Sequence, residues 1–344
     1  MSWGVVGQER AVAALERDLA QGRAAHAYLF VGPERVGKHT LALKLAQALN
    51  CEGADPPCDA CSPCRRIAAG RHADVQTVTV EGAPDGREAE AAHKEIRVGQ
   101  IREVERAVAL KAYEGRTRVV IIDPAEAMNG EAQNAFLKTL EEPPPQVTFL
   151  LVSAQEERLL PTIRSRCRQL ALRLLPVPRV AEELVGRGVE PERAQLLARL
   201  SRGRIGWALA MAADESLLAR RDKWLEEARS LAAISIAQRW ELAERLATAF
   251  RRDRDAVLDE VAAWQDWWRD VLLVQSQAEE GAGNGDRLDD LRLDASRHGR
   301  EEIAAFVREL RSSRQYLEDN VQPRLVLEAL LIQAPGAAEP VRKR

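Results

Sequence analysis

Four cysteines have the spacing in this 344-residue sequence that most clearly predicts chemistry. Cys51, Cys58, Cys61 and Cys64 lie in one short stretch, as two overlapping C-x-x-C steps and a fourth thiol one loop away. This spacing is typical of a tetrahedral zinc site made of thiolates. Because all four expected ligands are cysteines, no coordination position stays open for a substrate, and we predict a structural zinc ion.

A phosphate-binding motif precedes the cysteines. The segment G-P-E-R-V-G-K-H-T, residues 32–40, matches G-x-x-x-x-G-K, follows an apolar strand-like run and opens a helical pattern. Backbone N–H groups at such a helix start can cradle phosphates, and Lys38 would pair with their outer oxygens. We therefore expect a nucleotide site that includes Gly32, Gly37, Lys38 and Thr40.

Two positions around this motif depart from an active ATPase. The residue after the lysine should be Ser or Thr to hold magnesium, but it is His39, and Thr40 comes one place late, turned by about 100° on a helix. His39 either reaches a phosphate or is a polar surface residue. Asp123 ends an apolar run and is either a metal-orienting carboxylate or the residue that opens a turn before Pro124. An ATPase needs a glutamate at that next position, and Glu126 should point elsewhere.

An arginine lies in a third motif, I-R-S-R-C-R, at residues 163–168. On the residues alone, Arg166 is either a solvated or salt-bridged surface group or a functional guanidinium, and several arginines lie together here. Cys167, the fifth cysteine, is too remote in sequence to be needed for a four-ligand site. We expect it to be a small buried hydrophobic residue.

Composition limits the class of protein. With 46% hydrophobic and 30% charged residues the sequence is typical of a soluble chain, and its length predicts two or three domains. The formal net charge of −3 excludes a basic nucleic-acid coat. No apolar run reaches the ~20 residues of a membrane span, and the start has no signal-peptide shape. We predict a cytoplasmic location, where clustered thiols serve as metal ligands rather than disulfides.

The first half of the sequence alternates strand and helix patterns, which predicts an α/β fold with a parallel sheet covered on both faces. A polar loop is expected at 82–90. The expected strands are 26–31, 74–80, 118–123 and 147–153, and the expected helices include 40–49, 96–108 and 131–142.

Beyond about Leu174 the pattern is helical. L-L-P-V-P-R-V at 174–180 carries two prolines and indicates a linker, and 281–286 indicates a flexible loop between long amphipathic helices. Trp264, Trp267 and Trp268 form either a base-stacking platform or, as their helical spacing favours, a packed core or subunit contact.

Five features then coincide in one chain. They are V-V-G-Q at 5–8, the phosphate-binding loop, the inserted cysteines, N-A-F-L-K-T-L-E-E-P-P at 134–144 and S-R-C at 165–167. With these the sequence resembles the clamp-loader branch of the AAA+ ATPases, and within it the delta-prime family of bacterial DNA polymerase III subunits. The resemblance is strong up to about residue 215 and weaker over 320–331.

The resemblance implies three domains. It predicts an AAA+ P-loop domain over 1–173 with a zinc module at 51–64, and a small helical lid domain over 174–218. An all-α collar domain, which holds the subunits together, is expected over 219–334, followed by a disordered tail over 335–344.

The resemblance also sorts the sequence within the branch. Motor subunits carry a sensor arginine in a G-S-L-R-D-A-L-like segment, whereas G-R-I-G-W-A-L at 203–209 has Gly206 in that place. Together with His39 and Pro124, this implies a non-hydrolysing subunit that is not itself a competent ATPase, and ATP binding is in doubt. The nucleotide site is then vestigial, formed by Gly32, Gly37, Lys38, Thr40 and Asp123.

By the same resemblance, Arg166 is an arginine finger that acts in trans on the ATP site of a neighbouring motor subunit. Such a guanidinium stabilises charge on the transferred γ-phosphoryl group. The implied partners are the motor subunits (gamma/tau) and delta in a hetero-pentamer of the DNA polymerase III holoenzyme. Through that complex the chain would help load the sliding clamp onto primed DNA.

Two alternative functions stay open at this point. One is an ATP-hydrolysing motor subunit of the same branch, which Pro124 argues against. The other is a nucleic-acid-binding protein with a zinc module and a vestigial P-loop, which the net charge of −3 argues against. ATP turnover or tight, salt-sensitive DNA binding by the isolated chain would favour them respectively.

Overall fold

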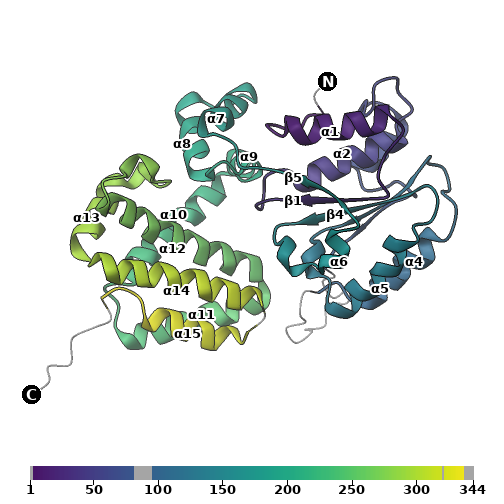
Figure 1. The fold of residues 1–344 in the computed structure, drawn as a ribbon. Coiled ribbons are helices and arrows are strands. Elements are labelled where there is room, and N and C mark those ends of the chain that lie inside the picture. Colours follow the sequence, from purple (N-terminus) through teal and green to yellow (C-terminus); the bar gives the residue numbers. More distant parts are fainter. Residues whose placement is uncertain (1–2, 81–94, 320, 337–344) are drawn as a thin grey trace, which may run out of the picture. The chain divides into compact units, whose positions relative to one another are not determined.

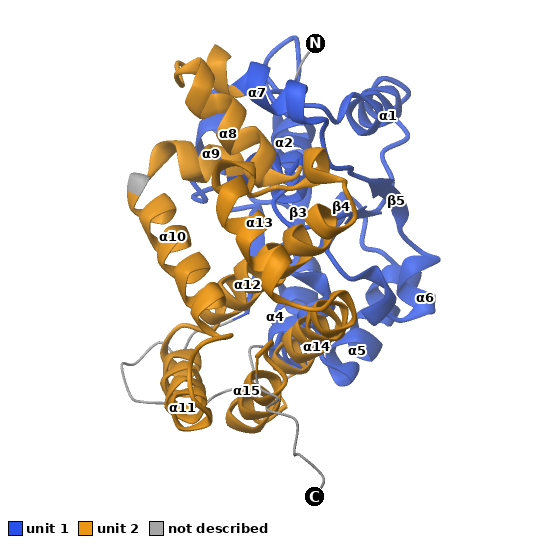
Figure 2. Ribbon diagram, turned by 90° about the vertical axis from the view of Figure 1, so that its left-hand side faces the viewer, with its two compact units in different colours: residues 1–183, 203–207 blue, residues 184–202, 208–344 orange. Residues whose placement is uncertain are grey.

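The computed structural model describes residues 3–80, 95–319 and 321–336 (Figure 1). The predicted polar loop at 82–90 and residues 337–344 of the predicted tail lie outside this part of the chain. The chain divides into two compact units, residues 1–183 with 203–207 and residues 184–202 with 208–344, which Figure 2 colours separately. The predicted boundaries of the lid and collar domains stay a prediction.

The first unit contains a parallel sheet of five strands in the order β2-β3-β4-β1-β5. All four predicted strands are confirmed. The short β5 at the edge was not predicted, because only Leu170 of its residues is buried, so it lacks the apolar run that marks the central strands. The strands are β1 (Ala27–Val31), β2 (Val75–Val78), β3 (Arg118–Ile122), β4 (Val147–Ser153) and β5 (Arg168–Ala171).

Helices cover both faces of this sheet, as predicted (Figure 1). Alternate side chains of one strand point to opposite faces. Tyr28 and Phe30 of β1 therefore pack with α1 (Glu9–Ala20) and α2 (Lys38–Asn50). Leu29 packs on the other face with a second set of helices. That set is α4 (Val98–Val108), α5 (Gly130–Glu141) and the short α6 (Pro161–Arg164).

This topology brings the phosphate-binding loop and Asp123 together. The carboxyl ends of parallel strands meet at one edge of the sheet, where α/β proteins bind ligands. The loop of residues 32–37 follows β1, and Asp123 follows β3, with β4 between the two strands. The cysteine segment continues from the far end of α2 into α3 (Ser62–Ala68), which packs beside α2.

Helix α7 (Val177–Gly186) corrects the predicted linker. The prolines of L-L-P-V-P-R-V do not prevent it, since Pro178 lies in the first turn, where a helix tolerates the missing N–H. Of the predicted linker, only residues 174–176 precede the helix. The helix α9 (Ile205–Ala213) begins within residues 203–207, the short segment in which the chain returns to the first unit.

The second unit is helical, as predicted. Trp264, Trp267 and Trp268 are fully buried, and Trp267 Nε1 donates a hydrogen bond to Asp294 Oδ2 at 3.1 Å. The prediction of packing is confirmed, and a base-stacking platform at these residues is excluded. The helices of this unit are α8 (Pro191–Ser201), α10 (Glu215–Ser230), α11 (Ile236–Arg252), α12 (Arg254–Gln275), α13 (Leu288–Arg297), α14 (Arg300–Glu318) and α15 (Pro323–Ile332).

The predicted flexible loop at 281–286 is anchored to α12. Asn284 is only 4% exposed, and both its backbone N–H and its side-chain amide donate to Asp270 Oδ2 at 2.8 Å. Arg221 also bonds to the Asn284 side chain and to Asp286. The glycines suggested mobility, but the sequence pattern could not reveal these partners on α10 and α12.

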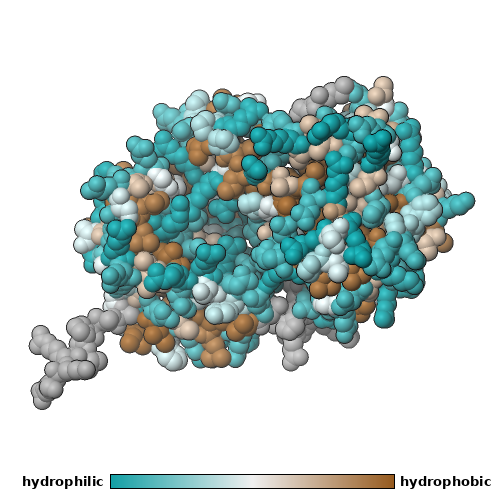
Figure 3. Space-filling view, in the orientation of Figure 1, coloured by the Kyte–Doolittle hydropathy of each residue, from teal (hydrophilic) through white to brown (hydrophobic). Residues whose placement is uncertain are grey.

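The surface is mainly hydrophilic, with small apolar patches on the face drawn in Figure 3. Exposed apolar side chains include Leu110, Tyr113, Trp240 and Leu325. Among the described residues, no helix combines the length and the apolar character that crossing a bilayer requires.

Candidate functional site

The phosphate-binding loop has a backbone that demands glycine at two of its predicted positions. Gly32 and Gly37 have φ angles of +142° and +99°, which other residues rarely adopt. A Cβ at Gly32 would also lie 2.3 Å from the carbonyl oxygen of Leu172, just after β5. The strand–loop–helix arrangement predicted for this motif is therefore confirmed, with Gly37 as the residue before α2.

Lys38 is buried and bonded within its own loop. Its Nζ donates to the carbonyl oxygens of Gly32 and Pro33, at 2.7 Å each, and the residue is 7% exposed. Burial lowers the pKa of the ammonium, against the raising effect of the nearby carboxylates of Glu126 and Asp123. The predicted phosphate ligand therefore already has two acceptors, and a nucleotide would have to replace them.

His39 and Asp123 bind each other. Nδ1 of His39 lies 2.7 Å from Oδ2 of Asp123, although 84 positions separate the two residues. This hydrogen bond is the largest effect on His39 and raises the pKa of its imidazole. His39, rather than Thr40, therefore meets the predicted metal-orienting carboxylate. Thr40 is exposed and lines a shallow cavity with Lys44 and Arg65, beside the cysteine segment.

The position directly after Asp123 lacks the glutamate that an ATPase needs. Pro124 occupies that position, and Glu126 is turned to the end of β4, where its Oε1 accepts a hydrogen bond from the N–H of Ala154 at 2.8 Å. Its carboxylate is nonetheless close enough to Lys38 to raise the pKa of that ammonium, so the expectation that Glu126 points elsewhere stays a prediction. Pro124 itself offers no carboxylate to position an attacking water as that glutamate does.

Gly206 contacts the phosphate-binding loop through its backbone. Its N–H donates to the carbonyl oxygen of Arg35 at 2.8 Å, and a Cβ added at Gly206 would lie 2.8 Å from the same oxygen. The obstacle is backbone, which cannot rotate away as a side chain can. The position of the missing sensor arginine is therefore closed to any side chain in this conformation.

Arg166 lies away from the phosphate-binding loop, between α6 and β5. Its side chain is 34% exposed and donates twice, to the carbonyl oxygen of Thr162 at 3.0 Å and to Oε1 of Glu141 at 2.7 Å. Cys167 beside it is buried in the core under the sheet, as predicted, and burial raises the pKa of its thiol to about 12. Arg166 thus has the exposure that a contact with another molecule requires.

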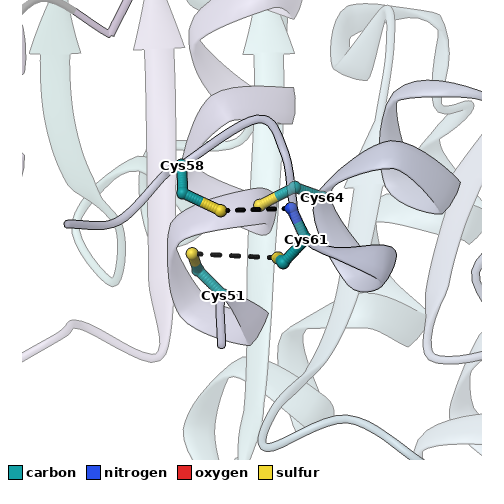
Figure 4. Close-up of side chains that lie close together, drawn as sticks. All are labelled: Cys51, Cys58, Cys61 and Cys64. Carbon is teal, nitrogen blue, oxygen red and sulfur yellow. Dashed lines mark hydrogen bonds between the residues drawn. The ribbon is translucent and has the colours of Figure 1, made fainter. Parts of the chain in front are cut away.

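The four predicted cysteine ligands converge. Their sulfur atoms all lie within 4.8 Å of one another, and the sulfurs of Cys51 and Cys61 are 4.0 Å apart (Figure 4). A tetrahedral zinc ion with sulfurs at about 2.3 Å would set them roughly 3.8 Å apart. The cluster has the size and the donor set for a metal ion of this kind.

Backbone N–H groups point at two of these sulfurs. The N–H of Gly53 donates to Cys51 Sγ, and that of Cys61 donates to Cys58 Sγ, at 3.3 Å each. Such bonds favour thiolate, and those from Cys61 and Ala60 lower the pKa of Cys58 to about 6. A Cβ at Gly53 would lie 2.8 Å from that of Cys58, so the turn requires glycine.

Two contributors to the site escaped prediction. Glu141, the partner of Arg166, lies in the segment N-A-F-L-K-T-L-E-E-P-P, which by itself indicates no role for this side chain. Gln8 of V-V-G-Q is buried and joins the start of the chain to the end of the sheet: its side chain exchanges two hydrogen bonds with the backbone of Arg173, at 2.8 and 3.1 Å. Neither sequence spacing nor residue type indicates these long-range partners.

Known proteins resemble this chain closely. A family model described as "DNA polymerase III, delta subunit" matches residues 7–176. The DNA polymerase III subunit delta' of Pseudomonas aeruginosa is 34% identical over 91% of this chain and 93% of its own length. That of Bacillus subtilis is 34% identical over 56% of each chain.

A differently named relative matches equally well by identity. The DNA polymerase III subunit tau of Escherichia coli is 34% identical over 79% of this chain, a match that takes up 42% of tau. Among solved structures, a DNA polymerase III gamma subunit-related protein of Thermotoga maritima covers 93% of this chain at 18% identity, with a TM-score of 0.45. The delta' and tau relatives named above are both 34% identical to this chain, so per cent identity does not distinguish a delta'-like from a tau-like subunit. The residues of the nucleotide site must make that distinction.

Proposed function

The chain belongs to the delta-prime family of DNA polymerase III subunits, and we propose that it serves the clamp loader without hydrolysing ATP itself. It is a clamp-loader subunit, as the resemblance predicted. The proposal concerns what it does in the complex: it supplies Arg166 to the ATP site of a neighbouring motor subunit and leaves its own nucleotide site unused.

The bond between His39 and Asp123 carries the first half of this proposal. In a working P-loop site, a hydroxyl after the lysine and a carboxylate at the strand end hold Mg²⁺ together. Here the hydroxyl is replaced by an imidazole, which takes up the carboxylate at 2.7 Å. Magnesium would have to break this bond and would still lack one of its ligands.

Lys38, Pro124 and Gly206 support the same conclusion. Lys38 is bonded to two carbonyl oxygens, Pro124 cannot position water, and Gly206 leaves no guanidinium beside a γ-phosphate. A nucleotide that entered would gain little metal binding and no catalysis. We therefore propose that ATP binds weakly or not at all, which disfavours the reading of the chain as an active motor.

Arg166 carries the second half of the proposal. Its guanidinium is partly exposed and lies in the S-R-C segment on which the family resemblance partly rests. An arginine supplied in trans can stabilise the developing charge on the γ-phosphoryl group and raise the rate by several orders of magnitude. Since we propose that its own nucleotide site is inactive, we also propose that the finger serves its neighbour.

We further propose that the four cysteines bind one structural zinc ion. The sulfur cluster fits tetrahedral coordination and leaves no open position. The alternative of a nucleic-acid-binding zinc protein has little support, because the net charge is −3 and the three clustered tryptophans are buried. The proposed partners are the motor subunits and delta, with clamp and DNA contacted through the complex. A cytoplasmic location belongs to the same proposal.

ATP hydrolysis by the purified chain, alone and mixed with motor and delta subunits, tests this function. The isolated chain should hydrolyse ATP at the background rate, and the full mixture should need it for rapid, DNA-stimulated hydrolysis. Turnover by the isolated chain that is abolished by Lys38→Ala would instead identify it as a motor subunit.

A further inference from the structure

Both hydrogen-bond acceptors of Arg166 belong to the first unit, as Arg166 itself does, and together they set the orientation of its guanidinium. Thr162 contributes a carbonyl oxygen from α6 at 3.0 Å, and Glu141 contributes a carboxylate oxygen from the last turn of α5 at 2.7 Å. The two acceptors take up separate nitrogens, Nη1 and Nη2. The plane of the guanidinium is therefore fixed by two elements.

These two bonds leave enough donors for a substrate. A guanidinium has five N–H groups in a rigid fork, so three remain when one is used by each acceptor. Three are sufficient for a bidentate contact with phosphate oxygens. Arg166 can thus engage a second molecule without giving up Glu141 or Thr162.

We propose that Glu141 is a positioning residue for Arg166, an inference that rests on the proposed trans-acting finger. A long, partly exposed arginine side chain loses conformational entropy when it is fixed in one rotamer. If this entropy is lost only in the transition state, it raises the barrier to ATP hydrolysis at each turnover. The charge-assisted hydrogen bond that Arg166 donates to Glu141 restricts the side chain within its own subunit, so part of this entropy is already lost before the motor subunit binds ATP. The carboxylate also keeps the guanidinium close to the backbone acceptor on α6.

If Glu141 hindered Arg166 instead of positioning it, removing its charge should change the rate of ATP hydrolysis in the opposite direction. If the carboxylate merely competed with phosphate for the guanidinium, its removal would free the finger and speed hydrolysis. Glu141 is 51% exposed, and such surface pairs are weak. Neutralising Glu141 should therefore leave folding and assembly unchanged and act through the orientation of Arg166.

The test is steady-state ATP hydrolysis by the complex assembled with motor subunits, delta, clamp and primed DNA. Glu141→Gln should lower kcat, by roughly twofold or more for a misoriented group, and leave KM for ATP unchanged. Glu142→Gln is the matched control, because it neutralises the exposed neighbouring carboxylate and should have no effect. Glu141→Asp, which keeps the charge, should recover part of the loss.

A double-mutant cycle separates this inference from the proposed function. Glu141→Gln should have no further effect when Arg166→Ala is already present. An equal loss in that background, or a faster or unchanged rate with Glu141→Gln alone, would overturn the positioning role while the finger stands. An unchanged rate with Arg166→Ala would overturn the finger itself, and the role of Glu141 with it.

Discussion

His39 Nδ1 lies 2.7 Å from Asp123 Oδ2, so the two side chains that would flank a nucleotide-bound magnesium ion bind each other. One residue opens α2 after the phosphate-binding loop, and the other follows β3. The loss of the hydroxyl at position 39 is thus more than a missing ligand. The replacement takes up the carboxylate that an active site would keep for the metal.

This pair predicts a pH-dependent contribution to stability. The bond raises the pKa of His39 in the folded chain, so its stabilisation is fully present below the ordinary histidine value of about 6.5 and is lost as the pH rises through the raised pKa. Thermal unfolding of the wild type and of His39→Gln should differ most near pH 6 and converge toward pH 9. Because half of the His39 side chain is exposed, the difference should not exceed about 1 kcal/mol.

Asp123→Asn provides the control for the His39 prediction. This substitution should abolish the same pH-dependent part of the stability that His39→Gln abolishes, since it deletes the charge that raises the pKa of the imidazole. A stability difference between wild type and His39→Gln that stays constant from pH 6 to pH 9 would contradict the account.

Gly206 should tolerate no side chain. Gly206→Ala places a Cβ 2.8 Å from the Arg35 carbonyl oxygen, so the start of α9 and the phosphate-binding loop must separate. We expect a loss of about 1–3 kcal/mol in the free energy of unfolding, as for other overpacked sites. The larger change Gly206→Arg should likewise fail to create ATPase activity, because the arginine cannot occupy the sensor position.

Gly99→Ala is the matched control for Gly206→Ala. Gly99 also lies in a helix, α4, but has open space around its Cβ position. There the substitution should leave stability unchanged or raise it by up to about 1 kcal/mol. Equal effects of the two substitutions in urea unfolding would show that the contact with Arg35 is unimportant.

The parts of this molecule that sequence predicts well are local. The four clustered cysteines span 14 residues and the phosphate-binding loop nine, so residue type and spacing are enough to indicate them. The central strands are continuous apolar runs, which is the pattern of a sheet covered on both faces. The short strand β5 and the start of α7 at Val177 lack such patterns, so the sequence does not predict either of them.

What could not be predicted depends on long-range pairing. His39 meets Asp123, Gly206 meets Arg35, and Glu141 meets Arg166, each across 25 or more positions. A sequence shows that a motif is altered, but only the fold shows which group takes its place. The resemblance indicated Arg166 without indicating the carboxylate that holds it.

Removal of the proposed zinc ion should loosen a loop far along the chain from the cysteines. Asn50, next to Cys51, exchanges two hydrogen bonds with the backbone of Thr117, at 3.0 Å each. Arg66, two residues after Cys64, pairs with Glu114 at 2.7 Å. Because Asn50 and Arg66 flank the cysteines, loss of the metal should weaken these contacts and loosen the loop of residues 113–117, although its N–H groups at residues 113–115 still donate to Asp74.

Hydrogen exchange measures this loosening directly. After chelation, or in Cys58→Ser with Cys61→Ser, amide exchange should rise over residues 51–66 and 113–117, with β1 and β4 still protected. Metal analysis should show one zinc per wild-type chain and none in the double variant. Disulfides without metal in freshly reduced protein, or unchanged exchange at 113–117 after metal loss, would contradict this link.

Arg166 defines the central claim, that this subunit completes the active site of another one. Arg166→Ala should leave the fold and the assembly of the complex intact, because its contacts with Glu141 and Thr162 lie at the surface. Arg166→Lys should restore little, since an ammonium lacks the planar fork. Since only one interface is affected, we expect a partial loss of hydrolysis and a larger loss of clamp loading.

The rate of DNA-stimulated ATP hydrolysis by the assembled complex, with wild-type chain or with Arg166→Ala, tests this claim most directly. We predict a lower rate with the variant at unchanged complex formation, measured on the same samples by gel filtration. Equal rates of hydrolysis and of clamp loading for the two complexes would contradict the claim and leave Arg166 an ordinary surface arginine.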